Sequence, residues 1–367
     1  DALAACQRAA ALEPGLYLAR FNVGNLLREK GFLAEAVIAY RAAIGVNPVF
    51  AEVHNNLGSV LKDMGRVQEA LDCFRQALVL KPDFADALYN AAQLLRDSGQ
   101  VDDAVGAFQS VIETRPGMVE AHYDLGNLLK NRGDKAGALA CYRSALQVDP
   151  DYAEARWAHA MTQLPMVAQD DAELARSRGE FAAELGALER WCEAAGPVKA
   201  ARAVGVQQPF YLAYQEEDNR ELLSRYGALC SRLMGAWQEA AGLRPAAIVT
   251  RAEIRVGIVS AHIHDHSVWN AIVKGWLQRL DRSRFDVRLF HLGKANDLET
   301  ALAKTMATHY TYGKTDPVEW AQLILGHQLD VLIYPEIGMD PTTAKLASLR
   351  LAPVQATSWG HPHTTGL

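Results

Sequence analysis

The feature that most limits the fold of this chain is a spacing of 34 residues that recurs through its first half. Prolines keep this spacing at Pro14, Pro48, Pro82, Pro116 and Pro150. Glycines keep it at Gly31, Gly65, Gly99 and Gly133, and aromatic residues keep it at Tyr40, Phe74, Phe108 and Tyr142. A fixed period of this length indicates one supersecondary unit, repeated so that each copy buries its hydrophobic face against the next.

Small residues complete the pattern. They recur at Gly24, Gly58, Ala92 and Gly126, and again at Ala36, Ala70, Ala104 and Ala138. The whole pattern resembles the tetratricopeptide repeat, which implies two antiparallel helices per unit, with glycine at the turn and proline after the second helix. Four full repeats cover residues 17–152, with part of an earlier repeat in 1–16 and of a fifth in 153–164. We therefore assign residues 1–164 to a superhelical repeat array.

One polar position in the first helix of each repeat also recurs in phase. It is occupied by Asn22, Asn56, Asn90 and Asp124. An amide side chain both donates and accepts hydrogen bonds, so a column of amides can pair with the backbone of an extended peptide of any sequence. We therefore predict that this column binds protein or peptide partners. The alternative is that these polar residues simply face solvent.

Composition narrows the class of protein. The chain has 367 residues, half of them hydrophobic, and a net charge of -6, which argues for a soluble globular protein and against a nucleic-acid partner. No apolar run is long enough to span a membrane, and no signal peptide opens the sequence. The five cysteines lack metal-ligand spacing and are odd in number, so we expect reduced packing residues in a cytoplasmic protein.

Residues 165–250 keep helical periodicity but lose the repeat, and we assign them to a helical connecting region. The pattern predicts helices over 170–195 and 218–242 and a loop over 196–208. An aromatic cluster in 209–215 contains Phe210, Tyr211 and Tyr214, for which we expect a packing role between the array and the next domain.

Residues 251–367 alternate between strand-like and helix-like segments. The predicted strands are 254–260, 285–292, 310–312, 329–334 and 354–359. Helices are predicted over 268–280, between the second strand and about residue 307, over 317–327 and over 341–349. Such alternation predicts a parallel sheet wound by crossover helices, a Rossmann-like α/β lobe. Polar loops follow the first and last strands, at the edge where open α/β sheets bind ligands.

The order of motifs resembles the O-GlcNAc transferase family and its bacterial homologues. A repeat array leads into VGIVSAHIHDHSV, then LDVLIYPEIGMD, then LRLAPVQATSWGHPHTTG. The resemblance implies a GT-B glycosyltransferase with two lobes, of which this chain holds only the first. We expect the sequence to begin inside a repeat and to end inside a domain, so that the second lobe, which in the family binds most of the nucleotide, is absent.

The activity that this resemblance implies is inverting, metal-independent transfer of GlcNAc from UDP-GlcNAc to Ser or Thr of protein acceptors held by the array. The nucleotide sugar is then a substrate, and no cofactor is implied. Two other reactions of related enzymes stay open, namely transfer of fucose and transfer of glucose to Asn. A repeat scaffold that binds protein partners without catalysis is the alternative from a different class.

By the same resemblance, His266 matches the family's functionally important histidine beside the donor sugar and acceptor hydroxyl. Imidazole titrates near neutrality, which suits a group that helps a Ser or Thr hydroxyl lose its proton. His266 can also act by orienting the sugar or the acceptor. The structural alternative is a loop histidine that caps the helix predicted after it.

A second loop matches the family's turn at the donor sugar. We assign donor-sugar binding to Trp359, Gly360, His361, Pro362, Thr364 and Thr365. The sequence departs from the common GYPGTTG form, with His361 in place of Tyr and His363 in place of Gly. This difference puts the identity of the sugar in doubt, because the loop shapes the sugar pocket.

A metal site is the competing interpretation of the histidine-rich loop. The residues His262, His264, Asp265 and His266, together with His361 and His363, have spacings close to those of zinc sites. The family resemblance requires no metal, and we predict none.

Overall fold

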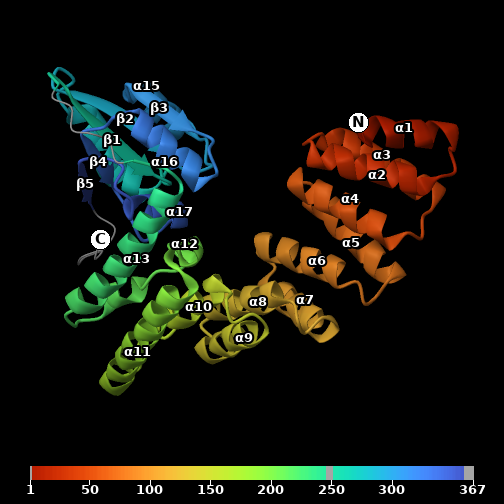
Figure 1. Cartoon of the computed structure of the whole chain (residues 1–367), viewed down its shortest axis with the longest axis horizontal. Coiled ribbons are helices and arrows are strands. Elements are labelled where there is room, and N and C mark those ends of the chain that lie inside the picture. The colour runs from red at the N-terminus through yellow and green to blue at the C-terminus, as the bar shows by residue number, and fades with distance from the viewer. Residues whose placement is uncertain (1, 245–250, 359–367) are drawn as a thin grey trace. The chain divides into compact units, whose positions relative to one another are not determined.

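The computed structural model describes residues 2–244 and 251–358 and divides into two compact units, Asp1–Pro150 and Asp151–Leu367. The first unit is all helical, and the second places a parallel sheet after a group of helices (Figure 1). None of the helices in the described ranges is both long and apolar enough to cross a bilayer.

The first unit consists of helices of nearly constant length. They are α1 (Ala2–Leu12), α2 (Tyr17–Glu29), α3 (Leu33–Val46), α4 (Ala51–Asp63), α5 (Val67–Leu80), α6 (Ala85–Asp97), α7 (Val101–Thr114), α8 (Val119–Asn131) and α9 (Lys135–Val148). From α2 onward they form pairs, each made of a first helix of 13 residues and a second of 14. The predicted tetratricopeptide array is confirmed.

The phased glycines and prolines sit where the backbone requires them. Gly31, Gly65, Gly99 and Gly133 follow the first helices with φ between 74° and 83°, in the left-handed region that side chains disfavour. Each proline stands two residues after the end of a second helix, where it cannot interrupt a helical hydrogen bond.

The small residue of each first helix lets an aromatic ring of the second helix approach. A Cβ atom added to Gly58 would lie 2.7 Å from a ring carbon of Phe74, and one added to Gly24 would lie 2.5 Å from Tyr40. Both rings are fully buried in the cores between helices. The pair therefore fixes the distance between the two helices of a repeat.

We expect Gly58→Ala to lower the free energy of unfolding of the protein by about 1–3 kcal/mol, because the ring of Phe74 must move in a packed core. Gly106→Ala is the matched control, since Gly106 lies within α7 with nothing within 4 Å of its added Cβ. There alanine should stabilise the helix by up to about 1 kcal/mol. Denaturant unfolding measures both, and equal effects would contradict the packing argument.

The helical part of the second unit comprises α10 (Ala153–Met161), α11 (Asp171–Ala195), α12 (Pro197–Ala200), η1 (Ala201–Ala203), η2 (Phe210–Tyr214) and α13 (Arg220–Ala240). The long predicted helices are present as α11 and α13. The loop predicted over 196–208 was wrong in part, because Pro197 begins a helical turn after Gly196. Of the aromatic cluster, Tyr214 is 67% exposed, so this ring lacks the packing role we expected.

The helix α10 has the sequence of a repeat but the packing of the second unit. Trp157, Met161 and Leu164 are buried in one hydrophobic core with α11, α13 and one face of the sheet. The repeat pattern of the sequence therefore continues past Pro150, where the first compact unit ends. The unit ends there because the residues after Pro150 pack with the second unit.

Five strands form one parallel sheet in the order β3-β2-β1-β4-β5. They are β1 (Ile254–Ser260), β2 (Phe285–His291), β3 (His309–Tyr312), β4 (Val331–Tyr334) and β5 (Val354–Thr357). The crossovers contain η3 (Trp269–Val273), a π-helical turn continued by α14 (Lys274–Arg279), then α15 (Leu298–Met306), α16 (Pro317–Gly326) and α17 (Pro341–Ala347). The predicted parallel sheet with crossover helices is present.

Helices cover both faces of this sheet (Figure 1). Alternate residues of β1 point to opposite sides, so Val256 and Ile258 join one core with residues of η3, α14 and α15. Val259 joins the other core, with α13, α16 and α17. Because β1 is buried on both faces, it reads in the sequence as a continuous apolar run.

Candidate functional site

The candidate site lies at the carboxyl ends of β1 and β4, which are neighbours in the sheet. The chain leaves β1 toward β2 on one side and returns through β4 on the other, which is the topological switch point where open α/β sheets bind ligands. The loops that follow β1 and β4 meet at this point. The first of them carries the three histidines singled out from the sequence.

A buried carboxyl group joins the two loops. Glu336, two residues beyond β4, is fully buried, and its Oε1 accepts hydrogen bonds from Ser260 Oγ at 2.9 Å and from the Ala261 N–H at 3.0 Å. Its Oε2 is buried without a hydrogen-bond partner among the described residues. Burial raises the pKa of Glu336 to about 7, because the charged form is poorly solvated there.

The other end of the histidine loop is fastened to α15. Asp297 caps that helix by accepting from the Thr300 N–H, and its second oxygen accepts from the Asp265 N–H at 2.8 Å. Thr300 Oγ1 donates to the carbonyl of Ile263 at 2.8 Å. These backbone hydrogen bonds lower the pKa of Asp297 to about 2, so the carboxylate stays charged and the loop keeps one shape.

The three histidine rings lie together. His262 and His266 stack with ring centroids 4.2 Å apart and planes 18° from parallel, while His264 lies 5.5 Å from His266. Burial lowers the pKa of His262, and the charges of His266 and His264 lower it further. Burial lowers the pKa of His266 too, and the charge of His264 lowers it further, which favours the neutral form of both rings.

His266 caps the helical segment that follows it. Its Nδ1 accepts a hydrogen bond from the Val268 N–H at 3.2 Å, and its carbonyl accepts from the Asn270 N–H. Because Nδ1 is an acceptor, the neutral ring carries its proton on Nε2. The residue thus has the capping role considered as its structural alternative, and this role leaves Nε2 as a hydrogen-bond donor.

A cavity of about 720 Å³ opens at the carboxyl ends of β2 and β3. His291, which ends β2 and is 1% exposed, lines it, with Nδ1 held 2.7 Å from Tyr310 OH. Burial lowers the pKa of His291 to about 4, so it is neutral. Three lysines also line the cavity, namely Lys294, Lys304 and Lys314.

Part of the predicted site lies outside the described residues. This applies to every donor-sugar residue we assigned, Trp359, Gly360, His361, Pro362, Thr364 and Thr365, and also to His363. Within residues 2–244 and 251–358, no group of three or more His, Cys, Asp or Glu side chains is arranged to hold a metal ion.

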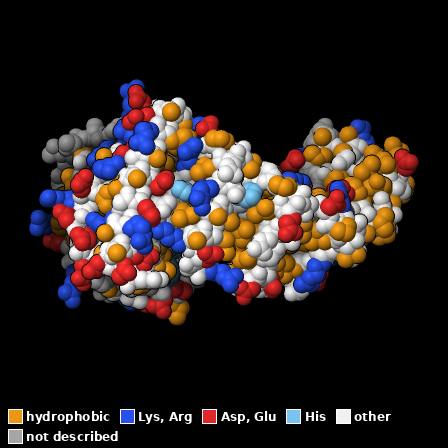
Figure 2. Space-filling model, turned by 90° about the horizontal axis from the view of Figure 1, so that it is seen from below, with side chains coloured by type: hydrophobic (Ala, Val, Ile, Leu, Met, Phe, Trp, Pro, Cys, Tyr) orange, Lys and Arg blue, Asp and Glu red, His pale blue; other side chains and the backbone are white. Residues whose placement is uncertain are grey.

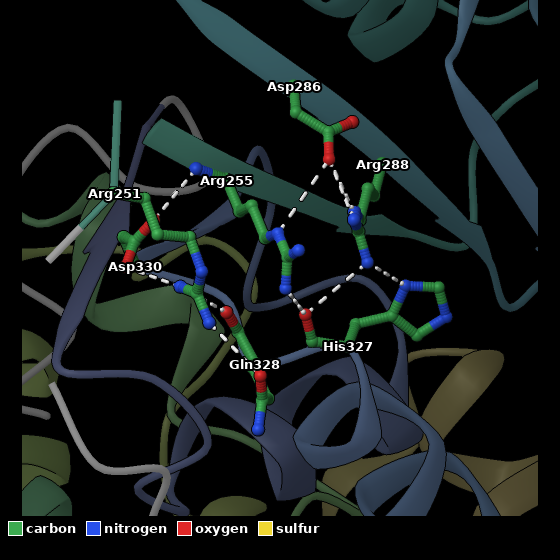
Figure 3. Close-up of polar contacts among 7 residues, drawn as sticks. All are labelled: Arg251, Arg255, Asp286, Arg288, His327, Gln328 and Asp330. Atoms are coloured by element: carbon green, nitrogen blue, oxygen red, sulfur yellow. Dashed lines mark hydrogen bonds and ion pairs between the residues drawn. The ribbon is translucent and has the colours of Figure 1, made fainter. Parts of the chain in front are cut away.

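A second cluster of charged residues lies at the opposite edge of the sheet (Figure 3). Arg288 pairs with Asp286 at 2.7 Å and donates to His327 Nδ1 at 2.9 Å, and Arg251 pairs with Asp330 at 3.1 Å. Burial alone would raise the pKa of Asp286, but hydrogen bonds and charge from Arg288 lower it below its usual value. These ion pairs join the amino ends of strands, away from the edge that carries the histidine loop, and we assign them a structural role.

In the array, the column predicted to bind peptide is linked from one repeat to the next. Asn56 Nδ2 donates to Asn25 Oδ1 at 2.9 Å, and Asn90 Nδ2 donates to Asn55 Oδ1 at 2.8 Å. Asn22 is exposed and makes no side-chain hydrogen bond within the described chain. The column therefore contains amides in defined orientations as well as one exposed amide.

Asp124, the last member of the column, differs from Asn22 because its side chain is buried. It is 8% exposed, accepts from Tyr89 OH at 2.9 Å and forms an ion pair with Arg96 at 3.0 Å. Burial raises the pKa of Asp124, and the charge of Arg96 opposes this rise without cancelling it. Its carboxylate is satisfied inside the array, so less of it is available to a peptide than the sequence position suggested.

The sequence did not single out Glu336 or His291. Glu336 stands within the motif LDVLIYPEIGMD, two residues past a buried strand, and an acidic residue in that position was the available indication. Its pairing with Ser260 depends on β1 and β4 being neighbours, although 76 residues separate Ser260 from Glu336. The order of the strands in the sheet depends on tertiary packing and cannot be predicted from the spacing of the motifs.

We expect Glu336 to make stability depend on pH. Its pKa rises on folding, so its contribution is fully present below the unfolded value near 4.5 and is lost as pH rises through about 7. Glu336→Gln keeps the acceptor oxygen and removes the charge. The variant should unfold at a higher temperature than the wild type at pH 8 and at a similar temperature at pH 5. A constant difference across this range would contradict the assignment.

Sequence models of the tetratricopeptide repeat match residues 24–65, 55–119 and 95–164. No curated protein sequence matches the chain.

Among solved structures, a mutant O-GlcNAc transferase from Thermobaculum terrenum is similar with a TM-score of 0.56 and 18% identity, over 86% of this chain and 52% of that one. This chain thus spans about half the length of that transferase. YrrB, described as a TPR protein with an unusual peptide-binding site, matches with a TM-score of 0.42 and 22% identity over 50% of this chain and 90% of its own. Pseudomonas aeruginosa PilF matches with a TM-score of 0.43 and 17% identity, over 54% and 85%.

The match to the transferase covers 86% of the chain and therefore extends well beyond the repeats. At this level of identity the likeness concerns the fold. The chain contains tetratricopeptide repeats followed by a small parallel α/β region, in a fold similar to that of a bacterial O-GlcNAc transferase.

Proposed function

We propose that this chain is the acceptor-binding array and first α/β lobe of a GT-B protein glycosyltransferase. The observation that carries the proposal is the pairing of a repeat array with a parallel sheet whose switch-point loop holds His266, in a fold similar to that of an O-GlcNAc transferase. The proposed reaction is inverting, metal-independent transfer of GlcNAc from UDP-GlcNAc to Ser or Thr of a protein. Fucose transfer and glucose transfer to Asn remain alternatives within the same class.

Acceptor binding is proposed for the amide column of the array. Asn90 Oδ1 accepts no hydrogen bond from the described residues, so it is available to a peptide N–H. Asn22 offers both a donor and an acceptor. Asn56 is held by Asn25 and Asn55, which fixes its orientation before a peptide arrives. An oriented amide loses little side-chain entropy on binding.

At the lobe, His266 is proposed to act through Nε2. The Val268 N–H occupies Nδ1, so Nε2 carries a proton and is a donor. A donor at this place stabilises the charge that develops on the departing diphosphate or orients a sugar hydroxyl. It does not accept a proton from the acceptor hydroxyl while the cap is formed. We therefore propose that His266 orients the sugar or the acceptor and does not act as the general base.

The donor sugar is proposed to lie against the loop that follows β5. Trp359, Gly360, His361 and Pro362 would form the wall of its pocket, and Thr364 and Thr365 would donate to an anionic group. The carboxyl ends of β1, β4 and β5 lie at the same edge of the sheet, because these strands are parallel.

A scaffold without catalysis is the second candidate. The observation that favours it is the compactness of the array, which forms its own unit with its own buried cores. Each repeat contacts mainly its neighbours, so protein binding needs no contribution from the lobe. Nucleotide-sugar binding separates the two candidates, because a pure scaffold gains no stability from that ligand.

The test uses the full-length protein that contains this sequence. It is incubated with protein acceptors and UDP-GlcNAc, GDP-fucose or UDP-glucose, and the intact mass of each acceptor is measured. We expect a mass gain with UDP-GlcNAc. No mass gain with any of the three sugars, together with no shift in the unfolding temperature, would support the scaffold.

Two substitutions separate the roles of His266. We expect His266→Ala and His266→Asn both to abolish transfer. Asparagine can still accept from the N–H two residues on, so only the alanine variant should lose stability, by about 0.5–1 kcal/mol. Turnover and denaturant unfolding on the same preparations are the measurements. Wild-type turnover in the asparagine variant would remove His266 from the mechanism.

For the array, we expect the triple change Asn22→Ala, Asn56→Ala and Asn90→Ala to weaken protein acceptors more than short peptides. Each lost hydrogen bond should cost about 1 kcal/mol of binding free energy, with incomplete additivity. The control is Gln68→Ala with Gln109→Ala, two exposed amides on second helices. Acceptor affinity is measured by titration, and an equal loss in the control would exclude the column as the binding surface.

A further inference from the structure

The second unit contains another open cleft, which the proposed transfer reaction does not use. It has a volume of about 940 Å³ and lies between the segment joining α10 to α11 and the segment carrying η2. Its lining residues fall within 165–174 and 210–217, and all of them belong to the described chain. The aromatic cluster singled out from the sequence forms part of this cleft.

The cleft exposes a hydrophobic surface to water. Tyr214 is 67% exposed, Met166 is 59% exposed and Val167 is 80% exposed. Phe210 holds Tyr214 in place through an edge-to-face contact with ring centroids 5.4 Å apart. Apolar side chains grouped in a concave surface, rather than scattered singly, are typical of a place where another molecule binds.

All the side chains of the cleft lining that are charged at neutral pH are acidic. They are Asp170, Asp171, Glu216 and Glu217. All four are exposed, and no Lys, Arg or His is among the lining residues. The cleft therefore carries four negative charges beside its aromatic rings.

The neighbouring cation does not neutralise these charges. Arg178 of α11 donates to the side-chain oxygens of Gln215 and Asn219 and to the carbonyl of Asp218, all of which are uncharged. Asp170 accepts from the Glu173 N–H and so caps α11. Asp171, Glu216 and Glu217 form no ion pair within the described residues.

We propose that this cleft binds an Arg- or Lys-rich polypeptide segment of a partner protein. The aliphatic stems of such side chains cover the exposed Tyr214, Met166 and Val167, and their charged heads reach the four carboxylates. A guanidinium group also stacks favourably on an aromatic face. One kind of residue can therefore contact both the exposed apolar side chains and the carboxylates of the cleft.

The same charges exclude other partners. Nucleic acids, anionic membrane surfaces and acidic peptides would all be repelled by four uncompensated carboxylates. The visible face in Figure 2 shows acidic and basic side chains interspersed, whereas the charged side chains that line this cleft are all acidic.

The test measures the fluorescence anisotropy of labelled peptides added to the whole chain. The probes are GSRLRLRLRSG, the acidic GSELELELESG and the neutral GSQLQLQLQSG, so that charge varies at constant apolar content. We expect only the arginine peptide to bind, with an affinity that falls at high salt because exposed charges are screened. Equal binding of the neutral peptide would overturn the basic partner in favour of an apolar one, and failure of the arginine peptide to bind would overturn the proposal.

Variants locate the binding. Glu216→Gln with Glu217→Gln should weaken the arginine peptide about fivefold, as expected for two exposed charge pairs. Tyr214→Ser should weaken it by a similar factor. The controls are Asp102→Asn with Asp103→Asn, an exposed acidic pair in the array, and Val79→Ser, an exposed apolar side chain. Unchanged affinity in the cleft variants, or equal loss in the controls, would place the peptide elsewhere.

Discussion

The position of β1 between β2 and β4 is the constraint on which the candidate site depends. Parallel pairing on both sides fixes the direction of all three strands and brings their carboxyl ends to one edge. The loop after β1 and the loop after β4 then become neighbours, and Glu336 can accept from Ser260 and Ala261. Without that pairing the histidines would follow a strand but would not lie beside the segment that carries Glu336.

The fold holds the loop that carries His266 from both ends. His266 ends the turn and caps the helical segment after it, which occupies Nδ1 and presents Nε2 as a donor. Asp297 and Thr300 hold the other side of the loop through backbone hydrogen bonds. A side chain that is fixed by the fold loses little freedom when a ligand arrives, so the capping role is compatible with the role in binding that we propose for His266.

In the array, one steric relation sets the geometry of the repeat. A small residue in the first helix faces an aromatic ring in the second, and a glycine with positive φ reverses the chain between them. The polar side chains of the first helices then align from repeat to repeat, close enough for Asn90 to reach Asn55. The second unit also contains the acidic cleft, which is lined by segments that belong neither to the repeats nor to the sheet.

The repeats and the alternation of strands with helices could be predicted from the sequence. A period of 34 residues and short apolar runs are local patterns, because helix and strand periodicity depend on near neighbours. The sequence also located the loop of His266 at the end of a strand. The contacts between residues far apart in the sequence became known only from the tertiary structure. Glu336 meets Ser260, Asp124 is buried against Arg96, Tyr214 stays exposed and α10 packs with the second unit. These contacts join residues far apart in sequence, and they depend on strand order and packing, which no local spacing encodes.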